Sequence, residues 1–262
     1  MANHHCSCDL NVDLATHVQQ LLFPKSSPLC GWACIGVKNR MARGLGGDYF
    51  DFIALPDGQQ GILIGDVTGH GMHASLIMAL LYGFIHNACL SLDSPVPVVR
   101  EVNTFLQNFA DRSREYDHFF SSTLFWGVIN PQTLEMAYVN AGHPPPMICR
   151  GQEILTLESC APPVGFFDDP EIGMAHIQLE PHDRLLLYTD GITETVGQEG
   201  ELFGEKGLQR LLLREHDAHD DCLKRIFSTL DHFGPGEAMD DATAIVIDIN
   251  APLLPEDCGH AS

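Results

Sequence analysis

Residues 46–71 restrict the fold most, because they predict a β-hairpin that carries two aspartates. Two arms rich in β-branched, aromatic and apolar residues, 46–52 and 62–71, flank the turn sequence Pro56-Asp57-Gly58. With the turn centred on Asp57, Asp48 and Asp66 each lie nine residues away and face each other across the ladder. Opposed residues of an antiparallel pair have Cβ atoms roughly 5 Å apart, and like charges there are destabilising. Spacing alone leaves two interpretations open: the pair holds a cation, or both aspartates simply end strands near solvent.

Further aspartates stand at the ends of other predicted strands. Asp190 follows the predicted strand 184–188, and Asp240 or Asp241 precedes the predicted strand 242–249. Carboxylates at strand ends can converge at one end of a sheet, and such oxygen ligands favour Mg²⁺ or Mn²⁺ over zinc. Two ions roughly 4 Å apart could bridge a water, lower its pKa and bind a phosphoryl oxygen. The sequence has no Cys or His pair with zinc-like spacing near these positions, no P-loop and no dinucleotide-binding glycine pattern.

The remaining predicted elements indicate an α+β fold class. Short turns join most of roughly nine or ten predicted strands, and one pair of helices follows Asp66 while another follows Asp190. Besides the two hairpin arms, the predicted strands span residues 32–37, 122–129, 135–140, 147–150, 153–157, 175–179, 184–188 and 242–249. The predicted helices after the hairpin span about residues 72–90, 96–114, 205–214 and 220–233. Clustered hairpins with inserted helix pairs predict antiparallel sheets covered by helices.

Composition limits the partners of this chain. The net charge of −21, from 35 acidic and 14 basic residues, disfavours nucleic acid and anionic membranes, which are bound through basic patches. A phosphorylated substrate stays compatible, because bound divalent cations can invert the local charge. No apolar run approaches the roughly 20 residues that span a bilayer, and the N-terminus lacks the features of a signal peptide. Nine irregularly spaced cysteines suit a reducing cytoplasm, so we expect a cytoplasmic protein.

The first residues predict an amphipathic helix. Asp9 can cap a helix that reaches about Phe23. Its apolar stripe consists of Leu10, Leu14, Val18 and Leu21. The helix Leu10–Phe23 could pack on the domain edge, on a regulatory partner or on a second copy. We therefore expect a tail and helix over residues 1–24, one main domain over 25–250 and a disordered tail over 251–262. The cluster of His4, His5, Cys6 and Cys8 could bind a soft metal, but a frayed terminus fits better because no second ligand pair has finger-like spacing.

Several motifs resemble one known family. The four main matches are Gly46-Gly47-Asp48-Tyr49-Phe50-Asp51, Gly65-Asp66-Val67-Thr68-Gly69-His70-Gly71, Tyr188-Thr189-Asp190-Gly191-Ile192-Thr193-Glu194 and Asp240-Asp241-Ala242-Thr243. Secondary matches are Asn140-Ala141-Gly142-His143-Pro144 and Phe203-Gly204. In this order and over about residues 10 to 250, they resemble the SpoIIE/RsbU-type branch of the metal-dependent protein phosphatases, the type-2C-like superfamily.

This resemblance implies a four-layer α-β-β-α sandwich, in which helices flank two antiparallel sheets. It further implies that residues 25–250 form the phosphatase domain and hold two Mn²⁺ or Mg²⁺ ions at one end. By position, Asp48 and Asp66 would bridge or flank both ions, and Asp190 and Asp240 would complete their ligands. The backbone carbonyl of Val67 would add a further ligand. Asp241 would stand beside Asp240 as its neighbour, with Asp240 preferred as the ligand.

The resemblance also implies a reaction and a substrate. A hydroxide bridging the two ions would attack the phosphorus of a phosphoserine or phosphothreonine. The substrate would be a phosphorylated regulatory protein, an anti-sigma-factor antagonist of a partner-switching pathway. Two alternatives stay open: a catalytically silent binding module that keeps the fold, and a phosphatase of small phosphoesters.

Three basic residues near these motifs have less defined roles. Where the wider superfamily has a histidine linked to protonating the leaving group, this chain has Thr68, and His70 lies two residues further on. His70 is therefore a candidate general acid or a structural residue. Arg43, five residues before Asp48, is a candidate phosphate ligand or a solvated surface charge. His143 is expected to be a turn residue.

Overall fold

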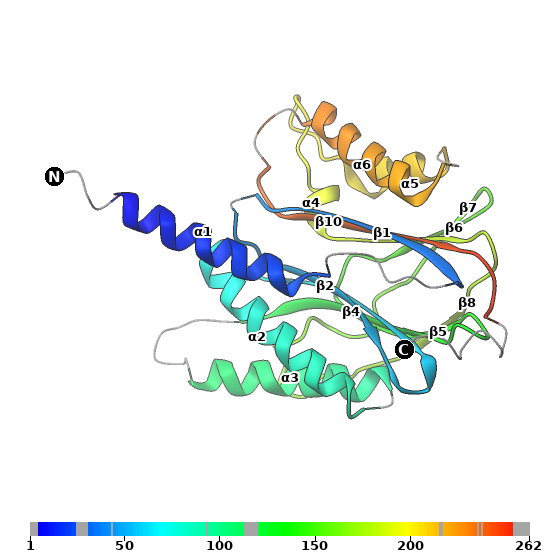
Figure 1. Ribbon diagram of the computed structural model, residues 1–262, viewed down its shortest axis with the longest axis horizontal. Coiled ribbons are helices and arrows are strands. Elements are labelled where there is room, and N and C mark those ends of the chain that lie inside the picture. Colours follow the sequence, from blue (N-terminus) through cyan, green and yellow to red (C-terminus); the bar gives the residue numbers. More distant parts are fainter. Residues whose placement is uncertain are drawn as a thin grey trace.

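The computed structural model describes residues 5–24, 31–42, 44–92, 94–112, 120–214, 217–234, 236 and 238–253, with the backbone alone for residues 5–12 and 57 (Figure 1). The predicted tail beyond residue 253 and the side chains of the His4–Cys8 cluster lie outside this part of the chain.

Two five-stranded antiparallel sheets form the centre of the molecule. The first sheet contains, in spatial order, β2 (Asp48–Ala54), β3 (Gln60–Val67), β4 (Ser122–Ile129), β5 (Glu135–Ala141) and β8 (Ala175–Gln178). The second contains β1 (Ala33–Arg40), β10 (Ala242–Ile249), β9 (Arg184–Tyr188), β6 (Met147–Arg150) and β7 (Glu153–Thr156). Four of these ten strands, β4, β6, β9 and β10, have the predicted ends, because turn residues bound each apolar run.

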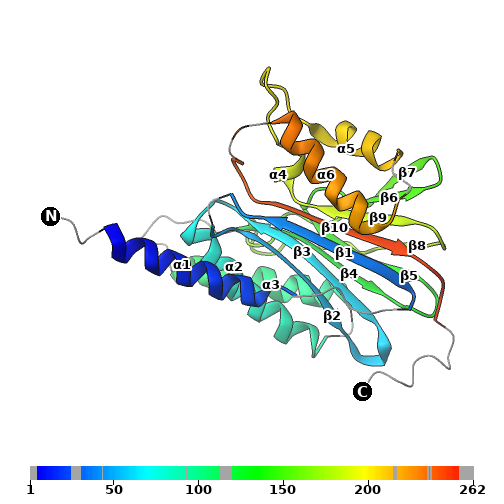
Figure 2. The same ribbon diagram turned by 45° about the horizontal axis from the view of Figure 1, so that its top comes forward.

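Helices cover the outer face of each sheet, as Figures 1 and 2 show. The helices are α1 (His5–Leu22), α2 (Met72–Cys89), α3 (Pro95–Arg112), α4 (Asp190–Thr193), α5 (Gly204–Leu212) and α6 (His219–Phe233). Helices α2 and α3 pack on the first sheet, α6 packs on β1 and β10 of the second, and α1 contacts α2. The expected four-layer α+β sandwich is confirmed.

Strand β10 shows how the sequence builds this sandwich. Ile245, Ile247 and Ile249 belong to the core between the sheets. Ala244 and Val246, which alternate with them, belong to the core under α5 and α6. Because successive side chains of a strand point to opposite faces, an uninterrupted apolar run is what a strand buried on both faces requires.

Helix α2 is the only described helix that is long and apolar enough to cross a bilayer, by length and composition alone. Its buried residues include Ile77, Met78, Leu81 and Ile85, and it packs on β2 and β3. On the same helix, His86 contacts the buried Asp51 of β2, with its Nε2 atom 2.6 Å from the carboxylate. The apolar composition of α2 thus matches its position over the core.

Besides shifted strand and helix ends, three local features differ from the expectations. Helix α1 begins at His5, four residues before the expected cap at Asp9. The hairpin turn contains one short 3-10 helix, Pro56–Gly58, instead of a simple tight turn. The segment after β9 forms α4, a single helical turn that begins at Asp190 itself.

Candidate metal centre

The β2–β3 hairpin has the predicted register. Asp48 is the direct partner of Asp66, and the Val67 N–H donates to the Gly47 carbonyl at 3.3 Å beyond this pair. On its other side Asp66 pairs with Thr123 of β4. The structure therefore places two carboxylates opposite each other at one end of the first sheet.

Hydroxyl groups of the second sheet hold Asp48. Its Oδ2 atom accepts hydrogen bonds from Thr189 at 2.8 Å and from Thr243 at 2.5 Å. The Thr243 hydroxyl accepts from Asn39 Nδ2, and the Thr189 hydroxyl accepts from the Thr243 backbone N–H. Each hydroxyl therefore directs its own hydrogen at Asp48. These contacts join β2 to β9 and β10 across the sandwich.

Asp190 is brought to the same place by the close approach of two backbone segments. A Cβ atom on Gly191 would lie 2.0 Å from the Asp241 carbonyl oxygen, so glycine is required there. The Thr189 N–H donates to the Thr243 carbonyl at 3.0 Å just before this point. Asp190 therefore lies beside the residues that precede β10.

The neighbours Asp240 and Asp241 differ in environment. The Asp241 carboxylate is buried and accepts from the backbone N–H groups of Ala42 at 2.8 Å and Gly47 at 3.0 Å. Asp240 is exposed, and its charge acts on Asp66 and Asp190. Asp241 thus supports the loop before Asp48, while Asp240 keeps its carboxylate near the other acids. This arrangement is compatible with the preference for Asp240 as a ligand, which stays a prediction.

The carboxylates raise one another's proton affinity. Burial raises the pKa of Asp48 to about 8, although the Thr243 hydroxyl opposes this shift. Burial, followed by the charges of Asp48 and Asp190, raises the pKa of Asp66 to about 9. Burial and then Asp240 raise the pKa of Asp190. Buried like charges of this kind are stable only when protonated or when a cation neutralises them.

The space in front of Asp66 depends on a glycine. A Cβ atom on Gly47 would lie 2.7 Å from Asp66 Oδ1 and 2.8 Å from the Val67 carbonyl oxygen. Both oxygens therefore border a space that any side chain at position 47 would fill. Within the described residues, no three His, Cys, Asp or Glu side chains already form a closed set of metal ligands. The oxygen donors and their excess negative charge nevertheless fit a hard divalent cation.

The remaining candidate site residues are His70, Thr68 and Arg43. His70 lies exposed on the turn after β3, near enough for its charge to lower the pKa of Asp241. Thr68, at the position linked to leaving-group protonation in the wider superfamily, shares a 2.8 Å hydrogen bond with Ser121. Arg43 lies outside the described residues.

Sequence reasoning missed the residues behind the aspartates. Thr189, Thr243 and Thr123 occur inside or next to apolar strands, where threonine is common for its β propensity alone. His143 belongs to a turn by sequence, but its ring is buried. Thr189 directly precedes Asp190, and Thr243 ends the motif Asp240-Asp241-Ala242-Thr243, so the sequence offered a signal for both. For His143 and Thr123 only the tertiary structure reveals the contact.

Helix α1 reaches the same loop. The buried Gln19 side chain donates to the Gly46 carbonyl at 2.7 Å and accepts from the Gly46 N–H at 3.1 Å. These two hydrogen bonds attach α1 to the loop that contains Gly47 and precedes Asp48.

A groove of about 520 Å³ adjoins the aspartates. Gly191 and Asp240 form part of its wall, together with the exposed apolar side chains of Val196, Leu202 and Met239. Arg40, Glu194 and Asp231 also line this groove, so its wall is partly apolar and partly charged.

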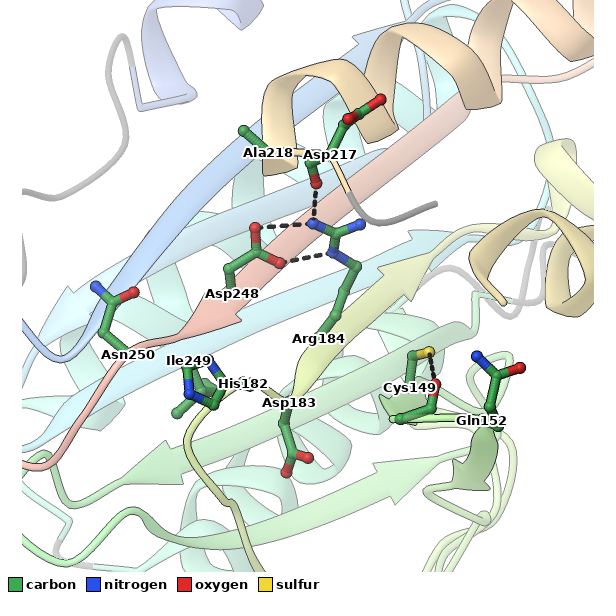
Figure 3. A pocket seen from close by; sticks show the side chains of 11 residues that line it. Cys149, Gln152, His182, Asp183, Arg184, Asp217, Ala218, Asp248, Ile249 and Asn250 are labelled. Carbon is green, nitrogen blue, oxygen red and sulfur yellow. Dashed lines mark hydrogen bonds and ion pairs between the residues drawn. The ribbon is translucent and has the colours of Figure 1, made fainter. Parts of the chain in front are cut away.

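A second cavity, of about 480 Å³, lies at the opposite end of the second sheet, where β9 begins and β10 ends (Figure 3). Arg184, the only Lys or Arg among its described lining residues, pairs with both carboxylate oxygens of Asp248 and donates to the Asp217 carbonyl. The Arg184 charge is thus paired with Asp248 and is not directed at the aspartate centre.

Comparisons with known proteins place the sequence of this chain in a family. The family model described as Stage II sporulation protein E (SpoIIE) matches residues 56–250. The chain is 30% identical over 210 residues to phosphoserine phosphatase RsbP of Bacillus subtilis, covering 78% of this chain and 49% of that protein. It is 28% identical to protein IcfG of Synechocystis sp., covering 91% of this chain and 41% of that protein. The chain thus spans less than half the length of these two relatives.

Solved structures share the fold. The SiaA-PP2C domain of Pseudomonas aeruginosa superposes with a TM-score of 0.83 at 18% identity, covering 95% of this chain and all (100%) of that one. At this identity the likeness shows a common fold, two sheets between helical layers.

Proposed function

Because the chain belongs to the SpoIIE family, we propose that it is a metal-dependent phosphatase of phosphoserine and phosphothreonine residues in proteins. The observation that carries this proposal is the gathering of aspartates from separate strand ends of both sheets. Asp48, Asp66 and Asp190 are partly or fully buried, and their pKa values are raised first by burial and then by the charges of neighbouring acidic side chains. This concentration of carboxylates supports divalent cations as the ligands of the site.

Two Mn²⁺ or Mg²⁺ ions bound here would lower the pKa of a water and neutralise charge on the phosphoryl group. Asp48, Asp66, Asp190 and Asp240 would hold them through carboxylates, and Val67 through its carbonyl oxygen. Thr189 and Thr243 fix the Asp48 carboxylate, and Asp241 fixes the loop at Gly47. His70 is the candidate proton donor on the open side of this site, and Arg43 the candidate phosphate ligand.

We propose a phosphorylated regulatory protein as the substrate, of the anti-sigma-factor-antagonist type in a partner-switching pathway. The name of the relative RsbP, a phosphoserine phosphatase, supports the phosphoserine part of this proposal. The groove formed by Val196, Leu202 and Met239 supports a polypeptide over a small phosphoester, because a small ester would leave this apolar surface unused. The strongly acidic chain supports the further proposal of no nucleic-acid or membrane partner. The irregularly spaced cysteines support the proposal of a cytoplasmic location.

Regulation through α1 is part of the same proposal. Leu14, Val18 and Leu21 are exposed on α1, and Leu76 and Leu80 are exposed on the adjoining α2. We propose that these side chains bind a regulatory partner or a second copy of the chain. Replacing Leu14 and Leu21 by serine is expected to weaken self-association or partner binding in analytical ultracentrifugation. Unchanged sedimentation, with and without the partner, would contradict this role for α1.

The decisive experiment measures phosphate release from a serine-phosphorylated antagonist protein with Mn²⁺ and with EDTA. Activity should require Mn²⁺. Asp190→Asn should lower it by more than the roughly 10- to 100-fold typical of changes behind a metal ligand, while circular dichroism stays unchanged. The exposed Asp168→Asn is the matched control. Metal-independent turnover, or full activity of Asp190→Asn, would contradict the proposal. Faster hydrolysis of p-nitrophenyl phosphate than of the phosphoprotein would favour the small-ester alternative.

A further inference from the structure

His143 lies inside the sandwich, although its sequence position is a turn. The Asn140 side chain accepts from the His143 backbone N–H at 2.8 Å and donates to the Leu157 carbonyl at 3.0 Å. Gly142 has φ +68° and would contact Pro163 if it carried a Cβ atom, so only glycine suits this bend. The turn therefore directs the imidazole inward, where it is 2% exposed.

One edge of the ring supports the backbone of Asp66. His143 Nδ1 lies 3.0 Å from the Thr123 hydroxyl, and this hydroxyl accepts from the Asp66 N–H at 3.2 Å. The same hydroxyl is 3.5 Å from the Asp66 carbonyl oxygen, so its hydrogen is better placed on His143. Burial lowers the pKa of His143 to about 3, so the ring is neutral. A neutral ring that accepts at Nδ1 carries its proton on Nε2.

The other edge faces the second sheet. His143 Nε2 is buried and makes no hydrogen bond within the described residues, yet the backbone of Tyr188 is near enough to raise the pKa of the ring. Tyr188 ends β9, two residues before Asp190. The ring therefore stands between the strand end that carries Asp66 and the strand end that leads to Asp190.

We propose that His143 is a positioning residue that fixes the separation of the Asp66 and Asp190 segments. Its ring lies between Thr123 on one side and the end of β9 on the other. This placement prepares the aspartates to bind a divalent cation. This inference rests on the proposed function, because it assigns His143 to the same centre. Among the described contacts, His143 makes no hydrogen bond to the side chains of Asp48, Asp66, Asp190 or Asp240 and acts through Thr123.

The test is the affinity of the EDTA-stripped protein for Mn²⁺ alone, measured by isothermal titration calorimetry. His143→Leu and Thr123→Val should each weaken Mn²⁺ binding about tenfold or more. The double variant should bind Mn²⁺ no more weakly than the worse single variant, because both substitutions break the same contact between His143 and Thr123. His143→Asn keeps an acceptor near Thr123, and Thr123→Ser keeps the hydroxyl. Both should bind Mn²⁺ within about threefold of the parent.

A purely structural role is separated by a matched control. Met136 is fully buried at the other end of β5, so Met136→Ala should lower Tm without changing Mn²⁺ affinity. The proposal is overturned if His143→Leu and Thr123→Val lower Tm only. If His143→Leu does not fold, the difference in Mn²⁺ affinity between Thr123→Val and Thr123→Ser tests the proposal.

Phosphatase assays on the same samples separate this inference from the proposed function. A parent protein that binds Mn²⁺ but hydrolyses no phosphoprotein contradicts the proposed function, while the affinities still decide the role of His143. A parent protein that binds no Mn²⁺ contradicts both.

Discussion

At the scale of single residues, the centre depends as much on small side chains as on acids. Gly191 allows the end of β9 to touch the segment before β10, and Gly47 leaves open the space beside Asp66. Thr189 and Thr243 aim two hydroxyl hydrogens at Asp48. Without these residues the same aspartates would be separated or blocked.

Gly47→Ala tests the open space directly. The new methyl group would lie under 3 Å from a carboxylate oxygen and a backbone oxygen, so we expect Mn²⁺ affinity to fall at least about tenfold, or about 1.4 kcal/mol. Calorimetric titration with Mn²⁺ measures this. Gly83→Ala is the matched control, because Gly83 is exposed on α2 and no atom of the described residues lies within 4 Å of the position of its Cβ. It should leave Mn²⁺ affinity unchanged and stabilise the helix slightly. Equal affinities for the two variants would contradict the prediction.

At the scale of elements, the β2–β3 hairpin connects the chemistry to α1. The Gln19 amide binds both backbone groups of Gly46, and the Asp241 carboxylate binds the next N–H, that of Gly47. The loop before Asp48 is therefore held from the helix side and from the β10 side. A shift of α1 would release one of these two supports.

Gln19→Leu should raise the Mn²⁺ concentration needed for half-maximal activity several-fold, because the Gly46 loop loses two buried hydrogen bonds of roughly 1 kcal/mol each. Gln19→Glu keeps the acceptor for the Gly46 N–H but sets a second oxygen against the Gly46 carbonyl, so it should not restore the parental Mn²⁺ dependence. Activity measured against Mn²⁺ concentration gives both values. Identical Mn²⁺ dependence in the parent and Gln19→Leu proteins would show that α1 does not influence the centre.

At the scale of the whole molecule, much of the sandwich could be predicted from sequence. Apolar runs bounded by turn residues gave the ends of β4 and β9, and the turn at Asp57 gave the Asp48–Asp66 register. The start of α1 could not be predicted, because helix ends depend on weak local preferences. The inward position of His143 could not be predicted either, since it depends on the Asn140 side chain reaching the Leu157 carbonyl just after β7.

The choice between Asp240 and Asp241 shows the same limit. The two residues are adjacent and chemically identical, so no local pattern distinguishes them. The distinction arises only because Ala42 and Gly47 present N–H groups to Asp241. The local sequence therefore predicted an acidic segment before β10, and tertiary contacts give Asp240 and Asp241 different environments.

The metal-free protein should lose stability as pH rises from about 4 to about 9. The pKa values of Asp48 and Asp66 are raised from 3.8 to about 8 and about 9 in the fold. Between these values the folded state binds more protons than the unfolded state, so the free energy of unfolding falls with increasing pH. Urea denaturation in EDTA at pH 5, 7 and 9 measures this slope. Asp66→Asn should reduce the slope and Asp168→Asn should not; equal slopes in all three proteins would contradict the assignment.

The hydrogen bonds to Asp48 also bear on the order of folding. Asp48 and Asp66 meet within one hairpin, but Thr189 and Thr243 reach Asp48 from 141 and 195 residues away. Contacts between residues so distant in sequence form late in folding, because the chain must lose the entropy of a long loop before these contacts can stabilise it. In stopped-flow experiments, Mn²⁺ should therefore slow unfolding and leave the refolding rate nearly unchanged. A metal that binds at the end of folding would act on the lifetime of the native protein, not on the speed of its formation.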